Sequence, residues 1–156
     1  MMEKGKSEIE QSMETMKTAC RNAGVKCTHQ RMEIYKEVVR NPVHPDAETV
    51  FRHVRDRMPT ISLDTVYRTL WLFRDLGLVI TLGEAYDRTR FDANLAPHHH
   101  FICGKCGKIV DFQSKELDEL KLSAHVEKLG EVRISQVIVH GVCVDCAGGK
   151  KHKDNQ

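Results

Sequence analysis

Residues 62–82, SLDTVYRTLWLFRDLGLVITL, carry a helical pattern followed by a strand pattern and set the architecture of the first half of the chain. Ser62 is a favourable N-cap, and Gly77 is a favourable stop for a helix. Between them the apolar side chains recur three or four residues apart: Val66, Leu70 and Phe73. This spacing predicts a helix over 63–76, and the apolar run 78–82 then predicts a strand.

Three more helical patterns precede this stretch. Their apolar residues are Ile9, Met13, Met16 and Cys20 within 8–22, Ile34, Tyr35, Val38 and Val39 after the N-cap Thr28, and Ala47, Val50, Phe51 and Val54 before Met58 and Pro59. A second strand is expected at 89–91, after a turn around Gly83 and Glu84. Helices followed by a β-hairpin match a winged helix-turn-helix, so we predict a winged-helix DNA-binding domain over residues 1–92.

The fourth helix of this pattern is the expected recognition helix. Its polar side carries Thr65, Tyr67, Arg68 and Thr69. In a winged helix, Thr65, Tyr67 and Arg68 are suited to read base edges in the major groove, while basic side chains such as Arg21 and Arg31 hold phosphates. The pattern alone fits equally well a helical bundle whose fourth helix shows its polar face to water.

Composition narrows the class of protein. The chain has 156 residues and a mass of 17.8 kDa, and it is too short for a large catalytic barrel. With 40% apolar and 29% charged residues, its composition suits a packed globular protein.

Neither a signal peptide nor a membrane-spanning run is apparent, so a cytoplasmic location with no membrane partner is expected. The net charge is only +2, but residues 17–40 carry six basic side chains against two acidic ones. Such a face can bind nucleic acid, although most charged faces simply meet water.

The second half of the chain has a different pattern, beginning after residues 93–97, which we interpret as a hinge. Strands are expected at 100–102 and 108–112, and an alternating strand at 132–142. Ser114 is expected to cap a helix whose inward side chains are Leu117, Leu120, Ala124 and Leu129. This predicts a small α/β domain over 98–147 and a mobile tail over 148–156, which makes the whole chain α+β.

Four of the six cysteines form two Cys-X-X-Cys pairs. They are Cys103 with Cys106, and Cys143 with Cys146. Random placement of six cysteines in a chain of this length gives only about 0.2 pairs at this spacing. Disulfides are disfavoured in a reducing compartment, and four thiolates suit a tetrahedral structural Zn²⁺. Two unrelated pairs of buried cysteines are the alternative interpretation.

Three of the nine histidines are consecutive, at residues 98–100. In an extended segment His98 and His100 point to one face and His99 to the other, so the first two can serve one ion. Asp111 lies on the strand beyond the cysteine turn, close enough to join them. The cluster predicts a second metal site, against the alternative that these are surface or packing residues.

Six short motifs occur in order between about residues 14 and 146. They are His44-Pro45, Thr65-Val66-Tyr67-Arg68-Thr69-Leu70, Arg90-Phe91-Asp92, the run from His98 through His100, Cys103 and Cys106 to Lys108, Ile109-Val110-Asp111-Phe112, and Gly141-Val142-Cys143 with Cys146. Together they resemble the ferric uptake regulator family, and most closely its peroxide-stress branch. The resemblance implies a metal-dependent transcription regulator with an N-terminal winged helix and a C-terminal dimerisation domain.

The resemblance also implies a regulatory ion held by ligands from both domains. The corresponding positions are His44, Asp92, His98, His100 and Asp111. Mixed imidazole and carboxylate donors suit Fe(II), Mn(II) or Zn(II). Such an ion would fix the angle between the two domains of a homodimer, so metal and a palindromic double-stranded DNA operator would strengthen each other's binding.

Asp111 is the residue that favours the peroxide-sensing branch, because iron-uptake regulators usually carry Glu there. In the peroxide sensors, Fe(II)-dependent oxidation converts the histidines corresponding to His44 and His98 into 2-oxo-histidine and releases the operator, whereas Mn(II) represses without this reaction. The expected function is therefore a peroxide-sensing repressor. The alternative is an iron, manganese or zinc uptake regulator of the same family.

Other classes of zinc protein are less compatible with the sequence. Zinc deaminases need His-X-Glu paired with Pro-Cys-X-X-Cys, and zinc proteases need His-Glu-X-X-His; neither arrangement occurs, so no enzyme activity is expected. A purely structural zinc-ribbon module would explain the four paired cysteines but would leave the candidate ligands of the second site unused. Cys20 and Cys27 have no role in any of these patterns.

Overall fold

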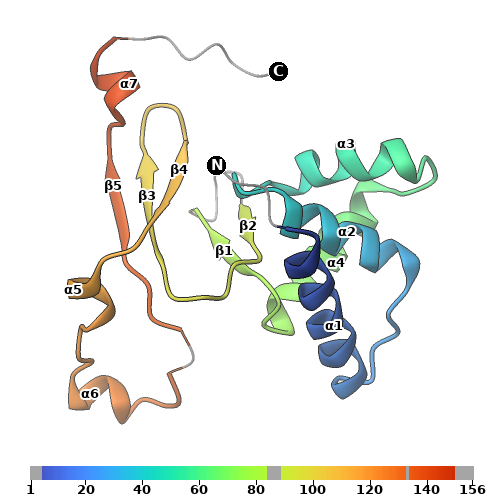
Figure 1. The fold of residues 1–156 in the computed structure, drawn as a ribbon, viewed down its shortest axis with the longest axis horizontal. Coiled ribbons are helices and arrows are strands. Elements are labelled where there is room, and N and C mark those ends of the chain that lie inside the picture. Colours follow the sequence, from blue (N-terminus) through green and yellow to red (C-terminus); the bar gives the residue numbers. More distant parts are fainter. Residues whose placement is uncertain (1–4, 84–88, 133, 150–156) are drawn as a thin grey trace. The chain divides into compact units, whose positions relative to one another are not determined.

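The computed structural model describes residues 5–83, 89–132 and 134–149. Along the chain it divides into two compact units, Met1–Leu95 and Ala96–Gln156 (Figure 1). The predicted turn around Gly83 and Glu84 lies partly outside the described residues, and so does most of the predicted tail over 148–156. The hinge over 93–97 stays a prediction.

The first unit consists of helices followed by a two-stranded sheet. Its elements are α1 (Lys6–Asn22), α2 (His29–Arg40), α3 (Ala47–Arg57), α4 (Leu63–Asp75), β1 (Ile80–Leu82) and β2 (Arg90–Asp92). The two strands pair antiparallel, with Ile80 opposite Asp92 and Leu82 opposite Arg90. This is the winged helix-turn-helix that the sequence predicts.

Side-chain caps explain where these helices begin. The side chain of Thr28 accepts the Arg31 N–H at 3.4 Å, and that of Ser62 accepts the Thr65 N–H at 3.1 Å. Asp46 caps α3 in the same way. Each cap satisfies a backbone donor that has no partner inside the helix, which contributes about 1 kcal/mol. The predicted helix starts at Thr28 and Ser62 are therefore confirmed.

The core of the first unit is built from the apolar faces of α1 to α4. Its fully buried members include Met16, Cys20, Ile34, Val50, Val54, Val66, Leu70 and Phe73. Tyr35 and Phe73 meet edge to face, with their ring centroids 5.2 Å apart. Burying side chains of this size stabilises a fold by roughly 1.5–3 kcal/mol each. This packing fixes α4 and leaves its polar side outward.

The second unit is a three-stranded sheet with short helices. Its elements are β3 (His99–Cys103), β4 (Ile109–Phe112), α5 (Lys115–Asp118), α6 (Ala124–Glu127), β5 (Ile138–Gly141) and α7 (Val144–Ala147). The strand order is β4-β3-β5, with β3 antiparallel to β4 and parallel to β5. The predicted α/β character is confirmed.

The single helix expected after Ser114 is wrong. Ser123 has an extended backbone, with φ −67° and ψ 150°, and starts a new helix, so α5 and α6 are separate four-residue helices. Leu120 and Leu129, expected to point inward, are 58% and 74% exposed. The first helix ends at its C-cap Glu119, four residues before Ser123, so the helical periodicity on which that expectation rested is interrupted between them.

Two smaller expectations are also corrected. The strand expected over 132–142 is limited to β5, whose pairing with β3 begins where Ile138 lies opposite His100. Thr69, assigned to the polar side of α4, is only 5% exposed. It lies three residues after Val66 and four before Phe73, so it shares their helix face and is drawn into the core.

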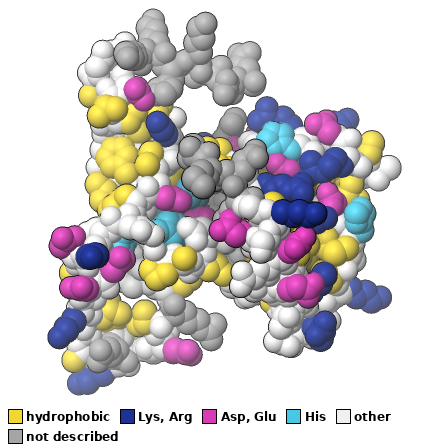
Figure 2. All heavy atoms as spheres, in the orientation of Figure 1, with side chains coloured by type: hydrophobic (Ala, Val, Ile, Leu, Met, Phe, Trp, Pro, Cys, Tyr) yellow, Lys and Arg dark blue, Asp and Glu magenta, His cyan; other side chains and the backbone are white. Residues whose placement is uncertain are grey.

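The two units differ in the side chains on their surfaces. Lys and Arg gather over the first unit, at the right of Figure 2, whereas hydrophobic side chains gather over the strands of the second, at the left. The exposed large apolar residues of the second unit are Val110, Leu120, Leu129, Val132, Ile134, Ile138, Val139, Val142 and Val144. Where exposed apolar side chains are contiguous, they are typical of surfaces that contact another protein. Within the described ranges, no helix is both long and apolar enough to cross a bilayer.

Candidate functional site

Four cysteine side chains meet at one end of the second unit. Cys103 ends β3, Cys106 lies in the following turn, and Cys143 and Cys146 lie just before and within α7. Their sulfur atoms all lie within 4.8 Å of one another, and Cys106 Sγ is 3.8 Å from Cys143 Sγ. Tetrahedral zinc, with Zn–S bonds of about 2.3 Å, separates its sulfurs by roughly 3.8 Å. The cluster therefore has the donors and the size that Zn²⁺ requires.

Backbone hydrogen bonds hold this cluster together. The sheet places Cys103 opposite Gly141, and the Gly104 N–H donates to Gly141 O at 2.8 Å. The Gly107 N–H closes the turn onto Cys103 O at 2.9 Å, with a left-handed φ of 67° that glycine adopts without strain. Backbone N–H donors, above all that of Cys143 at 3.3 Å, lower the pKa of Cys103 to about 6. Cys103 is thus a thiolate at neutral pH, the form that binds metal.

A second group of metal donors lies on the sheet of the same unit. His98 and His100 point the same way, with their Nε2 atoms 3.0 Å apart. Asp111, opposite His100 on β4, places its carboxylate 3.4 Å from His100 Nε2 and 3.9 Å from His98 Nε2. Nδ1 of His98 donates to the Ala96 carbonyl at 2.7 Å, which makes Nε2 the acceptor atom of the neutral ring. Two imidazole nitrogens and one carboxylate therefore converge on one point.

A histidine and a carboxylate also pair in the first unit. His44 Nε2 lies 3.5 Å from Asp92 Oδ2, and both side chains are buried. Two hydrogen bonds from β2 hold the segment that carries His44 and Pro45. Arg90 donates to His44 O at 3.2 Å, and the Phe91 N–H donates to Pro45 O at 3.0 Å. Among the described residues, His44 is the one non-glycine with positive φ, at 54°. That backbone costs roughly 1 kcal/mol and is typical of functional positions.

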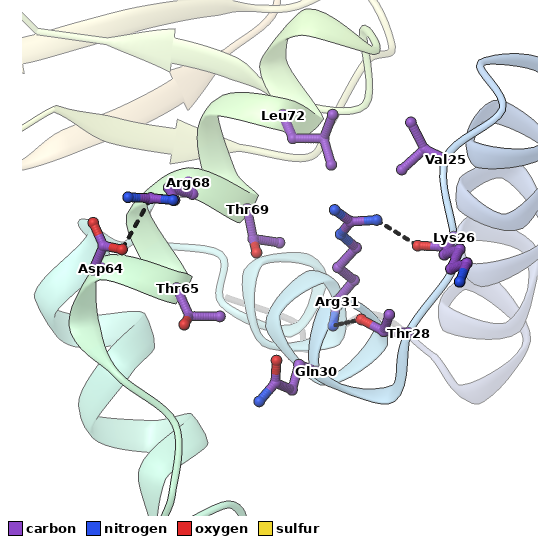
Figure 3. A pocket seen from close by; sticks show the side chains of 10 residues that line it. All are labelled: Val25, Lys26, Thr28, Gln30, Arg31, Asp64, Thr65, Arg68, Thr69 and Leu72. Carbon is purple, nitrogen blue, oxygen red and sulfur yellow. Dashed lines mark hydrogen bonds and ion pairs between the residues drawn. The ribbon is translucent and has the colours of Figure 1, made fainter.

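The polar side of α4 borders a hollow of about 680 Å³, whose opposite wall is the start of α2 and the loop before it (Figure 3). Thr65 and Arg68 line one wall, and Arg31 lines the other. The Arg68 guanidinium lies 2.9 Å from Asp64 Oδ2, and the Arg31 guanidinium donates to the Lys26 carbonyl. Three of the five residues predicted to contact DNA thus border the same hollow.

The other two predicted DNA contacts lie apart from that hollow. Tyr67 is 40% exposed on α4, and Arg21 is exposed in the last turn of α1. Neither is among the residues that line the hollow. Both remain predictions.

Sequence reasoning missed some residues of these surfaces. Lys26 and Gln30 line the hollow beside Arg31. Their positions on either side of the N-cap Thr28 were a usable signal, because residues flanking a cap gather at the N-terminal end of the helix. His99 accepts the Val137 N–H at Nδ1 and lies 3.1 Å from Asp118. That pair joins β3 to α5 and has no local sequence signal, since its members are far apart along the chain.

A winged helix on the same chain as an α/β unit with a four-cysteine cluster fits the class of metal-responsive, DNA-binding transcription regulators, but a fold by itself does not give a function. The comparison with known families gives the particular family. The model of the ferric uptake regulator family matches residues 22–140, and the chain belongs to that family. Its members are transcription regulators rather than enzymes.

Individual relatives agree with this assignment. The chain is 37% identical over 139 residues to the peroxide-responsive repressor PerR of Staphylococcus epidermidis, covering 88% of this chain and 92% of that one. A ferric uptake regulator from Francisella tularensis, solved with iron, superposes with a TM-score of 0.65 at 27% identity, covering 80% of this chain and 96% of that one. The ferric uptake regulator of Helicobacter pylori has the same fold, with a TM-score of 0.73 at 22% identity over 94% of this chain and 97% of that one.

Proposed function

We propose that this chain is a peroxide-sensing repressor that binds a palindromic DNA operator as a homodimer. Zn²⁺ on the four-cysteine cluster would be structural, and Fe(II) or Mn(II) would be the regulatory ion. The observation that carries the proposal is the convergence of the His98 and His100 Nε2 atoms with the Asp111 carboxylate. The similarity to a peroxide-responsive repressor supports the same function.

The proposed regulatory ligands are the two donor groups taken together. They are His44, Asp92, His98, His100 and Asp111. Imidazole nitrogens and carboxylate oxygens suit Fe(II) and Mn(II) better than they suit a thiol-seeking ion. Because His44 and Asp92 belong to the winged-helix unit and the others to the second unit, one ion bound by all five would join the units in a single arrangement. Metal and operator would then increase each other's affinity by the same factor.

The proposed response to peroxide depends on which metal ligands are oxidised when peroxide reacts at the bound iron. When bound, Fe(II) supplies the electron that breaks the O–O bond of peroxide, and Mn(II) does so far less readily. The proposed targets are His44 and His98. Oxidation of either ring to 2-oxo-histidine removes the nitrogen lone pair that binds the metal. This weakens metal binding and so releases the DNA.

DNA recognition is assigned to the winged helix. Thr65, Tyr67 and Arg68 on α4 would contact base edges, and Arg21 and Arg31 would contact phosphates. The basic surface of the first unit supports this role (Figure 2). Each phosphate contact releases counterions, so affinity would fall steeply as salt is raised.

Asp92→Asn tests the proposal with little change in side-chain volume. The probe is double-stranded DNA selected by the Mn(II)-loaded wild-type protein from a randomised pool. We expect the Mn(II) concentration needed for half-maximal DNA binding to rise at least about tenfold, since loss of one ligand weakens a metal site by at least that much. Bound zinc should stay at the wild-type ratio, because Asp92 is not in the cysteine cluster.

Asp118→Asn is the matched control, because Asp118 is also a carboxylate beside a histidine but is not a proposed ligand. It should leave the Mn(II) dependence unchanged. An Asp92→Asn protein with wild-type Mn(II) dependence would contradict the proposed ligand set. Selected sequences without two-fold symmetry would contradict the palindromic operator.

A further inference from the structure

An acidic residue, Asp64, lies on the face of α4 that is proposed to meet DNA. It lines the hollow together with Thr65 and Arg68 (Figure 3). Asp64 and Arg68 are four residues apart, so one turn of the helix places their side chains next to each other. Arg68 Nε lies 2.9 Å from Asp64 Oδ2, and the two side chains are 80% and 70% exposed. The ion pair therefore lies on the open surface of the helix, outside the packed core.

A carboxylate at this place opposes DNA binding unless it has a specific role. The phosphates of DNA repel it, and like charges that meet in an interface weaken binding. Asp64 is not the cap of α4, because the Ser62 side chain accepts the Thr65 N–H at 3.1 Å. The Thr65 hydroxyl is engaged in the same cap, with its Oγ1 2.8 Å from Ser62 Oγ. The contact that the Asp64 carboxylate makes on this face is therefore the one with Arg68.

This contact restricts how Arg68 can bind. An exposed arginine has many rotamers, and restraining them before binding reduces the entropy that association costs. Because the carboxylate contacts Nε, the end of the guanidinium formed by Nη1 and Nη2 is left to donate two parallel hydrogen bonds. In the major groove guanine presents two neighbouring acceptors, N7 and O6, whereas adenine places a donor beside its acceptor. An arginine presented in this way is selective for guanine.

We infer that Asp64 is a positioning residue, which orients Arg68 toward a guanine in each half-site of the operator and so sets the base preference there. The inference rests on the proposed function, because it takes α4 to enter the major groove of a palindromic operator. Charge gives it a distinctive consequence. Removal of the carboxylate strengthens attraction to DNA of any sequence, while it weakens the preference for guanine. A role confined to the stability of α4 would not change the base preference.

The test uses the DNA that Mn(II)-loaded wild-type protein selects from a randomised pool. Dissociation constants are measured for this DNA and for variants in which each G·C pair, with its two-fold partner, is replaced by A·T. For the wild type we expect one position at which the replacement weakens binding at least about fivefold, as for a bidentate contact of arginine with guanine. Arg68→Lys should remove most of this preference, which identifies the base pair that Arg68 contacts.

Asp64→Ala should lower the preference at that same position at least about threefold, while it binds DNA of unrelated sequence at least as tightly as the wild type does. Asp75→Ala is the matched control. Asp75 is also an exposed aspartate of α4 paired with an arginine, Arg74 at 2.6 Å, but it does not line the hollow. The control makes the same change in net charge and should keep the wild-type preference.

An Asp64→Ala protein with the wild-type preference at the position identified by Arg68→Lys would overturn the inference, and so would a base pair other than G·C at that position. An equal loss of preference in Asp64→Ala and Asp75→Ala would also overturn it, because net charge alone would then explain the change. These results leave the proposed function intact, since selection, two-fold symmetry and Mn(II) dependence are measured with the wild type. A wild-type protein that selects no DNA would contradict the proposed function and this inference together.

Discussion

At the scale of single residues, a buried carboxylate network links α2 to α3. Glu33 accepts hydrogen bonds from Lys36 at 2.9 Å and from Arg57 at 3.1 Å, and Arg57 also donates to Glu37 at 2.8 Å. Burial alone raises the pKa of Glu33, but the bonds from Lys36 and Arg57 outweigh it, and the net pKa lies below 4.5. The ionised form of Glu33 is therefore stabilised by folding.

This network predicts the pH dependence of the stability of the first unit. A carboxylate with a lowered pKa in the folded state contributes stability above its unfolded pKa and loses it as the pH falls through the folded value. Glu33→Gln should lower the free energy of unfolding by about 1 kcal/mol at pH 7. Below about pH 4 the difference from the wild type should shrink toward zero.

Urea unfolding followed by tryptophan fluorescence measures this difference, because Trp71 is the one tryptophan of the chain and lies on α4 of the same unit. Glu10→Gln, at an exposed position on α1, is the control and should match the wild type at both pH values. A Glu33→Gln deficit that is the same at pH 7 and at about pH 3 would show that ionisation of Glu33 is not its cause.

At the scale of elements, β5 is an edge strand of the described sheet, and its exposed side chains include Ile138 and Val139, at 42% and 40%. An open strand edge with apolar side chains is a surface for pairing with another chain. The same unit carries the other exposed apolar residues of the second half (Figure 2). We propose that this surface forms the contact between the two subunits of the homodimer.

Val139→Lys tests the dimer surface. Burying a valine contributes roughly 1.5–3 kcal/mol, and a two-fold interface repeats each contact, so the dimer dissociation constant should rise at least about tenfold. Sedimentation equilibrium measures it. Val43→Lys, at a similarly exposed valine of the first unit, is the control. Equal dissociation constants for the two variants would place the dimer contact elsewhere.

The elements that the sequence predicts well are those with strong local signals. Thr28, Ser62 and Gly77 mark helix boundaries by their own chemistry, and the apolar periodicity between them is long enough to be unambiguous. The short helices of the second unit lack this length, so the cap at Ser123 was missed. The extent of β5 depends on its pairing with β3, a contact between distant residues that no local pattern encodes.

At the scale of the whole molecule, the candidate metal donors have clearer signals in the sequence than the surroundings that position them. The Cys-X-X-Cys spacing is local, and the same-side placement of His98 and His100 follows from extended backbone. The left-handed backbone of His44 and the pairing of His99 with Asp118 depend on tertiary contacts. Which donors share one ion depends on the arrangement of the two units, which sequence spacing does not give.

The proposed function requires that peroxide act on particular ligands only when iron is bound. The direct measurement is a tryptic map of protein loaded anaerobically with Fe(II) and given about one equivalent of hydrogen peroxide, with Mn(II)-loaded protein as the control. His44 lies in peptide 41–52 and His98 in peptide 91–105, where fragment ions separate it from the two neighbouring histidines. We predict a gain of one oxygen on His44 or His98 in the iron sample alone, together with loss of DNA binding. Unmodified histidines in iron-loaded protein that still binds DNA would contradict peroxide sensing and leave a regulator that responds to metal supply.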